Sequence, residues 1–189
     1  MTPQQIAQAI RRMYADLDAI RDALNAADRV MGDGDTGMTV ANVVTAWYAA
    51  LADDHADTSS MLLALGRATR RVSGSSLGSV IGIGLSAAGK AGVPSAVAML
   101  DAATAAIVER SGANAGDKTI LDSLIAVRNA LASEEDALDA AERVVDEFRA
   151  RESKIGRARI YGAKSAGHDD PGMLAALLLL RAAQSQEAT

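Results

Sequence analysis

Apolar residues recur at spacings of three and four along most of the chain, and no segment shows the sustained alternation of a half-buried strand. Over residues 3–25 this spacing makes one apolar stripe, formed by Ile6, Ile10, Met13, Leu17, Ile20 and Leu24. Alanine, the best helix former, supplies about a fifth of the chain, and there are only three prolines. The pattern predicts an all-α fold.

The periodicity divides the chain into eight predicted helices, separated by short glycine-rich or polar connections. They cover residues 3–25, 38–52, 58–72, 79–90, 94–112, a stretch after Asp117, 134–154, and a stretch that begins at Pro171. Short connections make neighbouring helices antiparallel, so alternate loops fall at the same end. The loops after the first, third, fifth and seventh helices are rich in Gly, Asp, Ser and Lys. We therefore expect the polar loops to converge on one rim.

Composition narrows the possible functions. The 189 residues suffice for a single domain over residues 1–189, and the absence of cysteine excludes thiolate metal sites, cysteine nucleophiles and disulfides. A net charge of -5 argues against nucleic acid as a partner. The N-terminus does not resemble a signal peptide, and the apolar run over residues 173–180 is too short to span a membrane. We expect a soluble cytoplasmic protein without a membrane partner.

Three carboxylates in eight residues are the central motif. Asp28, Asp33 and Asp35 leave the end of one predicted helix, where they would repel each other unless a cation lay between them. Such hard oxygen ligands suit Mg²⁺, and the nearby glycines Gly32, Gly34 and Gly37 would allow the sharp turn. The alternative is a solvated acidic turn that caps the next helix through Asp35 or Thr36. A calcium EF-hand fits less well, because Val44 stands where its glutamate belongs.

Two further loops offer groups for a phosphate. Ser73, Gly74 and Ser75 precede a helix with hydroxyls and backbone N–H groups, although an ordinary Ser/Gly cap explains them equally well. The segment 116–119 is similar: the alternative there is an Asp117 N-cap beside an exposed Lys118. Residues 84–91 imitate a P-loop, but alanine replaces its Ser/Thr, so a helix end capped by Gly89 is favoured.

A glycine-punctuated basic segment lies at residues 154–172. A flexible basic loop near the aspartates would supply the positive charge that a transferring phosphoryl group requires. A nucleic-acid patch is the weaker alternative, because the segment has one tyrosine for stacking. His168 is interpreted as a structural hydrogen-bonding residue, and His55 as solvated.

Taken together, these motifs resemble, in order and spacing, the nucleotide-binding L subunit or L domain of dihydroxyacetone kinases. The resemblance covers nearly the whole chain and rests on Asp28-x4-Asp33-Gly-Asp35, Ser73-Gly74, Gly116 to Thr119, and Lys154 to Gly172. It implies an eight-helix antiparallel up-and-down barrel whose rim holds ADP or ATP through two Mg²⁺ ions. Asp28, Asp33 and Asp35 would be the metal ligands and, with Lys164, the catalytic residues. The nucleotide contacts would come from Thr36, Ser73, Gly74, Ser75, Gly116, Asp117, Lys164, Asp170, Pro171 and Gly172.

The resemblance also implies partners. In the family a separate K subunit or domain holds the small ketone that receives the phosphate. The L subunit either exchanges ATP or keeps ADP, which a phosphotransferase-system protein rephosphorylates. The sequence leaves open whether the chain forms a homodimer.

Two positions depart from the family pattern. Thr36 stands where histidine is usual, as in the Asp-Gly-Asp-Thr-Gly loop of the related fatty acid kinases, and Lys164 replaces an arginine. The second change turns a two-pronged phosphate contact into a point charge. The predicted function is a magnesium-dependent phosphotransferase subunit acting on dihydroxyacetone or a related ketose. The alternatives are a nucleotide-binding regulatory module without turnover and a fatty acid kinase-related nucleotide domain.

Overall fold

The computed structural model describes residues 1–93 and 95–185, which form nine α-helices and one 3-10 helix. No strand occurs in these ranges, so the all-α prediction is confirmed. The elements are α1 (Pro3–Ala15), α2 (Leu17–Asp28), α3 (Thr36–Ala50), α4 (Thr58–Val72), α5 (Ser76–Ala91), α6 (Ala96–Ser111), α7 (Ile120–Ala132), α8 (Ala137–Arg149), η1 (Arg157–Ser165) and α9 (Pro171–Gln184).

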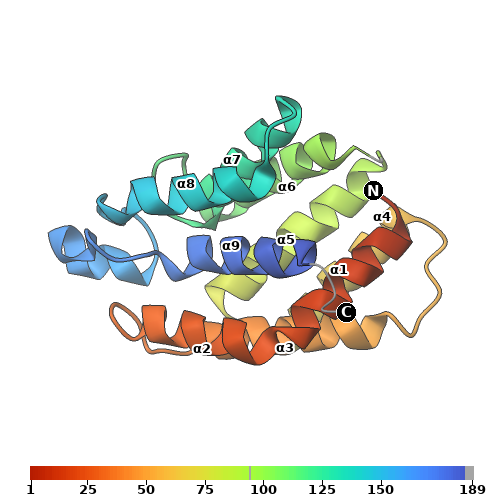
Figure 1. Cartoon of the computed structure of the whole chain (residues 1–189), viewed down its shortest axis with the longest axis horizontal. Coiled ribbons are helices and arrows are strands. Elements are labelled where there is room, and N and C mark those ends of the chain that lie inside the picture. Colours follow the sequence, from red (N-terminus) through yellow and green to blue (C-terminus); the bar gives the residue numbers. More distant parts are fainter. Residues whose placement is uncertain (94, 186–189) are drawn as a thin grey trace.

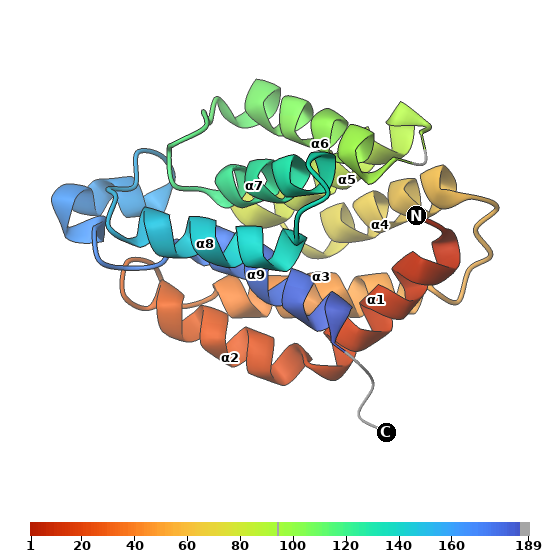
Figure 2. The same ribbon diagram turned by 45° about the horizontal axis from the view of Figure 1, so that its top comes forward.

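The helices close into a ring of sequential neighbours. Each α-helix packs against the next one in the chain, and α9 returns to pack against both α1 and α2 (Figures 1 and 2). The largest core cluster joins α1 to α4 with α9 and includes one residue each from α5 and α6. Its most deeply buried members include Leu24, Val44 and Met61. Within this core, Trp47 Nε1 donates to Thr69 Oγ1 at 2.8 Å, so α3 and α4 are also tied by a buried hydrogen bond.

The first predicted helix is wrong as a single element, because it breaks at Asp16. This residue has φ -93° and ψ 9°, ends α1 and directly precedes α2. The apolar stripe nevertheless continues across the break: Ile6 and Ile10 of α1 and Ile20 and Leu24 of α2 are buried in one cluster. The period alone therefore gave no signal for two helices.

Several predicted boundaries also shift. The helix at 58–72 is confirmed as α4, but α3 begins at Thr36, α5 at Ser76, and α8 ends at Arg149. Gly89 does not cap α5; it is buried inside that helix, where a Cβ would lie 2.9 Å from Leu63 Cγ, and Gly92 with φ 67° is the C-cap. Because residues 84–91 are helical, they do not form a P-loop. Pro94, the predicted start of the next helix, lies outside the described residues.

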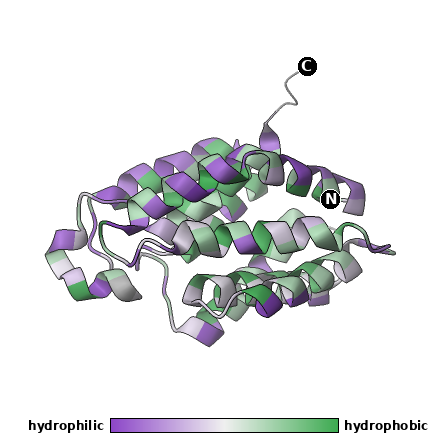
Figure 3. Cartoon of the chain, turned by 90° about the horizontal axis from the view of Figure 1, so that it is seen from below, coloured by the Kyte–Doolittle hydropathy of each residue, from purple (hydrophilic) through white to green (hydrophobic). Residues whose placement is uncertain are grey.

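The polar loops do meet at one end of the ring. The connections 29–35, 73–75, 112–119 and 150–170 all lie at the end where α2 finishes, on the left of Figures 1 and 2. Within the described ranges, none of the helices combines the length and the apolar character needed to cross a membrane. Hydrophilic and hydrophobic residues are mixed along the helices (Figure 3).

Candidate functional site

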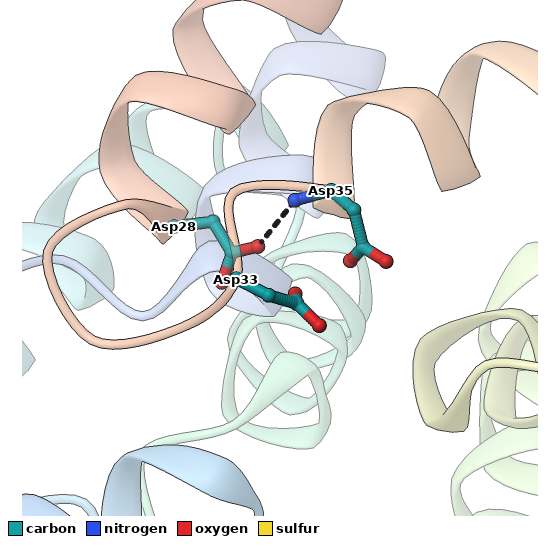
Figure 4. A group of neighbouring side chains, drawn as sticks. All are labelled: Asp28, Asp33 and Asp35. Atoms are coloured by element: carbon teal, nitrogen blue, oxygen red, sulfur yellow. Dashed lines mark hydrogen bonds between the residues drawn. The ribbon is translucent and has the colours of Figure 1, made fainter.

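The three predicted metal ligands converge in the structure. Asp28 is the last residue of α2 and is buried, Asp33 lies in the following loop, and Asp35 is the N-cap residue of α3. One carboxylate oxygen from each residue lies within 4.8 Å of the other two (Figure 4). Asp33 and Asp35 are exposed, so the cluster has one fixed, buried member and two members that face solvent.

Asp28 also builds the loop that carries the other two aspartates. Its Oδ2 accepts a hydrogen bond from the backbone N–H of Asp35 at 2.9 Å (Figure 4). The same oxygen accepts from the N–H of Thr36 at 3.1 Å. Asn25 Oδ1 similarly accepts from the N–H of Gly37 at 2.8 Å. The first amides of α3 are therefore capped by side chains of α2, and Asp35 makes no side-chain cap of its own. The alternative of a turn capped through Asp35 is thus wrong.

Of the three glycines of this loop, Gly34 has the predicted turning role, whereas Gly32 and Gly37 make room for neighbouring atoms. Only Gly34 has a positive φ, 77°. A Cβ at Gly32 would overlap Asp28 Oδ1, and one at Gly37 would overlap the carbonyl oxygen of Arg21. Gly32 therefore leaves room for a carboxylate oxygen, while Gly37 allows α3 to approach α2 closely.

The donor set fits a hard divalent cation. All three groups are carboxylates, the ligand type that Mg²⁺ prefers, and their oxygens are close enough to share one ion. The loop holds the three carboxylates close together, so without a cation their negative charges would repel each other and destabilise the loop. Two exposed members leave the remaining coordination positions open to water or phosphate.

The loop before α5 is a helix cap. Ser75 is the N-cap and accepts from the N–H of Gly78 at 3.0 Å, while the hydroxyls of Ser73 and Ser75 lie 3.0 Å apart. Gly74 is exposed, and a Cβ there would meet no atom within 4 Å. The structure thus shows the capping role; contact of Ser73, Gly74 and Ser75 with a nucleotide stays a prediction.

The loop before α7 does not form the Asp117 N-cap beside an exposed Lys118, and its contact with a phosphate stays a prediction. Thr119, and not Asp117, is the N-cap of α7, and the Asp117 carboxylate instead accepts from the N–H of Asn114 at 2.7 Å. Lys118 is not exposed: only 1% of its surface is accessible. Asp122, which the sequence reasoning missed, is buried and accepts from the N–H groups of Gly116 at 2.6 Å and Thr119 at 2.8 Å.

The basic segment contains a helix and a half-buried acid. Lys164 is exposed in η1, and Asp170 is the N-cap of α9, accepting from Met173 N–H at 2.9 Å. Burial raises the pKa of Asp170 to about 6, although the N–H groups of Met173 and Gly172 and the charge of Lys118 oppose the shift.

Hydrogen bonds bring this segment to the loop before α7. The N–H of Lys154 donates to the carbonyl of Asp117 at 3.1 Å, and a Cβ at Gly172 would lie 3.5 Å from Ile120. Pro171 is the first residue of α9. His168 is exposed, whereas His55 is half-buried with Nε2 3.0 Å from the carbonyl oxygen of Ala50, so its predicted solvation is wrong.

A comparison with solved structures finds a similar fold within a kinase. The chain superimposes on the dihydroxyacetone kinase from C. freundii in complex with AMP-PNP and Mg²⁺ with a TM-score of 0.75 and 26% identity, over 93% of this chain and 32% of that one. The DAK2 domain family matches residues 30–185, and the chain belongs to this family. The predicted resemblance is confirmed.

Two curated relatives differ in their names and in how much of their length this chain covers. The L-erythrulose 1-kinase of Mycolicibacterium smegmatis is 33% identical over 94% of this chain and 34% of its own length. The ADP-binding subunit DhaL of the PEP-dependent dihydroxyacetone kinase 1 of Listeria innocua is 27% identical over 86% of this chain and 85% of its own. The chain thus spans about a third of the first relative and most of the second.

Proposed function

We propose that this chain is the nucleotide-binding part of a magnesium-dependent kinase that phosphorylates dihydroxyacetone or a related small ketose. The observation that carries the proposal is the convergence of Asp28, Asp33 and Asp35 within 4.8 Å at the rim. The names of the relatives support the class of reaction, since one acts on L-erythrulose and another binds ADP.

The proposed ligands follow from the position of each group. Asp28, Asp33 and Asp35 would hold two Mg²⁺ ions, whose charge would neutralise that of the phosphates of ADP or ATP. Contacts to the nucleotide would come from residues in the surrounding loops: Thr36, Ser73, Gly74, Ser75, Gly116, Asp117, Lys164, Asp170, Pro171 and Gly172. Helices α3, α5, α7 and α9 all begin at this rim, and the partial positive charge of a helix N-terminus favours anions.

The chain's own residues would act by positioning and electrostatics. Asp28, held by the two amides of Asp35 and Thr36, fixes the loop, so Asp33 and Asp35 present their oxygens without reorganising. The ammonium of Lys164 would stabilise negative charge that develops on the transferred phosphoryl group. No covalent nucleophile is required on this chain.

The acceptor site is proposed to lie on a partner. A K subunit or K domain would hold the ketose, and the single domain over residues 1–189 would supply the nucleotide. Since the name of the Listeria innocua relative describes a PEP-dependent kinase, a phosphotransferase-system protein is a candidate donor that would recharge retained ADP. The proposed setting is the cytoplasm.

A transfer assay tests the kinase against the regulatory alternative. The purified chain is denatured and the released nucleotide is identified, then the native chain is mixed with labelled ATP, a K subunit and dihydroxyacetone or erythrulose. We expect labelled ketose phosphate, and a rate at least about tenfold lower with Lys164→Met. Lys90→Met, an exposed lysine on α5, is the matched control and should transfer at the unaltered rate. Tight nucleotide binding without transfer to either ketose would instead indicate a regulatory module.

A further inference from the structure

Lys118 is a buried charge for which the proposed reaction has no direct use. It lies between Asp117 and the N-cap Thr119, has a positive φ of 63°, and is 1% exposed. Removing an ammonium from water is costly unless hydrogen bonds replace its hydration. Burial of Lys118 is therefore tolerated only if each of the three N–H groups of its ammonium has an acceptor.

All three N–H groups of Lys118 have a backbone acceptor. Nζ donates to the carbonyl oxygens of Arg149 at 3.3 Å, Arg151 at 2.7 Å and Ser165 at 2.9 Å. An ammonium has three donors, so its capacity is filled. Arg149 is the last residue of α8, where the carbonyls lack partners within the helix and the helix dipole is negative. The ammonium supplies both the missing donors and the opposite charge.

These carbonyls lie where a loop begins, at Arg149 and Arg151, and where it ends, at Ser165. The beginning and the end of the loop are close together. The N–H of Gly167 donates to Arg149 O at 2.7 Å, and Ser165 Oγ accepts from Ser153 N–H at 2.8 Å. Residues 150–166 therefore form an excursion with a narrow neck, and Lys118 enters that neck from the loop before α7. We call residues 150–166 the rim loop.

Beyond the neck, the rim loop is held by the hydrogen bond from Lys154 N–H to the Asp117 carbonyl and by Ile155, which packs against a small core cluster, while its far end is exposed. Its distal part is η1, where Ile160 is 84% exposed and Lys164 is exposed. Gly156 and Gly162 have positive φ values of 75° and 50°, so the backbone there leaves ordinary helical geometry. The bonds at the neck, together with these contacts, determine where η1 and Lys164 lie relative to the rest of the rim.

We propose that Lys118 is a positioning residue: its ammonium clamps the neck of the rim loop to the loop that carries Gly116, and so sets the place of Lys164. The second half of this statement rests on the proposed function, because only there does Lys164 meet a nucleotide. The first half concerns the nucleotide-free chain and stands independently.

Hydrogen–deuterium exchange of the nucleotide-free chain tests the clamp. In Lys118→Met we expect the amides of Ser153, Lys154 and Gly167 to exchange at least tenfold faster, while those of α3 and α4 keep their rates. Lys90→Met is the control and should leave all of them unchanged. Unaltered exchange at the neck in a folded Lys118→Met protein would overturn the proposal.

A chemical rescue keeps the test decisive if that variant does not fold. The chain has no cysteine, so Lys118→Cys introduces a single thiol that can be alkylated in the unfolded state. Aminoethylation restores an ammonium at the original distance, and propylation gives the same shape without charge. We expect slow exchange at the neck, or folding itself, only in the aminoethylated product. Equal behaviour of the two products would contradict the role of the ammonium.

Affinity for ADP and Mg²⁺ separates this inference from the proposed function. We expect folded Lys118→Met, or the propylated product, to bind ADP at least about tenfold more weakly than its charged counterpart. If the unaltered chain binds no nucleotide, the proposed function fails, but the exchange result still decides the clamp. If the neck loosens and affinity is unchanged, the clamp stands and its control of Lys164 is wrong.

Discussion

At the scale of single residues, the two oxygens of Asp28 have separate roles. Oδ2 accepts two backbone amides and fixes the turn into α3, while Oδ1 lies beside Gly32, which has no Cβ to displace it. A carboxylate that is held in this way keeps one orientation whether or not a cation is bound. Preorganisation of this kind lowers the free-energy cost of assembling a metal site.

Gly32→Ala tests whether this space matters. The added methyl group would overlap Asp28 Oδ1, so the carboxylate must turn or the loop must move. We expect Mg²⁺-dependent ADP affinity to fall by about 10- to 100-fold, the range seen when groups that orient a metal ligand are lost. Titration calorimetry measures the affinity, and far-UV circular dichroism should show unchanged helix content. Wild-type affinity in the variant would show that Asp28 needs no such space.

The convergence of the three aspartates could be predicted from the sequence, whereas the burial of Lys118 could not, for a physical reason. The spacing of Asp28, Asp33 and Asp35 puts them on one short turn, so their convergence is a local property. The acceptors of Lys118 are backbone carbonyls 31 to 47 residues away, and no side-chain type in the sequence marks them. Its environment is therefore set only by the tertiary fold.

At the scale of elements, each helix that starts at the rim has its first amides capped by a side chain. The amides of α3 are capped by Asp28, and α5, α7 and α9 by Ser75, Thr119 and Asp170. The last of these combines a cap with a half-buried carboxyl group whose pKa is raised to about 6. Above that pH the charged form of Asp170 opposes folding.

Asp170→Asn tests this conflict through its pH dependence. Asparagine caps a helix as well as aspartate does, but it carries no charge. Because the folded pKa of about 6 exceeds the ordinary 3.8, the stability linked to Asp170 is full below pH 3.8 and is lost as pH rises through 6. At pH 8 we expect the free energy of unfolding of the nucleotide-free variant to exceed that of the wild type by about 1–3 kcal/mol. This difference should disappear toward pH 4. A difference that does not vary with pH would contradict the burial effect.

Element prediction depended on whether the boundary had a local signal. Helix α4 was predicted with its observed bounds, and its Asp57 N-cap accepts from Ser60 N–H at 2.7 Å. The break at Asp16 was missed because a small change in ψ ends one helix while the apolar period continues into the next. The spacing of apolar residues indicates which face of a helix is buried. When the same face stays buried on both sides of a break, the spacing does not change and the break cannot be predicted from it.

At the scale of the whole molecule, the main core and the candidate site lie in different parts of the ring. The main core lies chiefly among α1 to α4 and α9, whereas the candidate ligands lie on loops and helix ends at one end of the ring. The alternation of polar and plain connections predicted that common end correctly. What the sequence did not provide is the contact between the rim loop and the loop before α7, which depends on how α7, α8 and α9 pack.

The most direct test of the central claim is a calorimetric titration of ADP into the chain with Mg²⁺ and with EDTA. The account predicts binding by the wild-type protein that requires Mg²⁺, and a loss of at least about 100-fold in both Asp33→Asn and Asp35→Asn, since each removes a charged ligand. The circular dichroism spectra of both variants should match that of the wild type, because these exposed side chains lie outside the core. Equal affinity for ADP in all three proteins, or affinity that EDTA does not lower, would contradict the assignment of Asp28, Asp33 and Asp35 as the magnesium site.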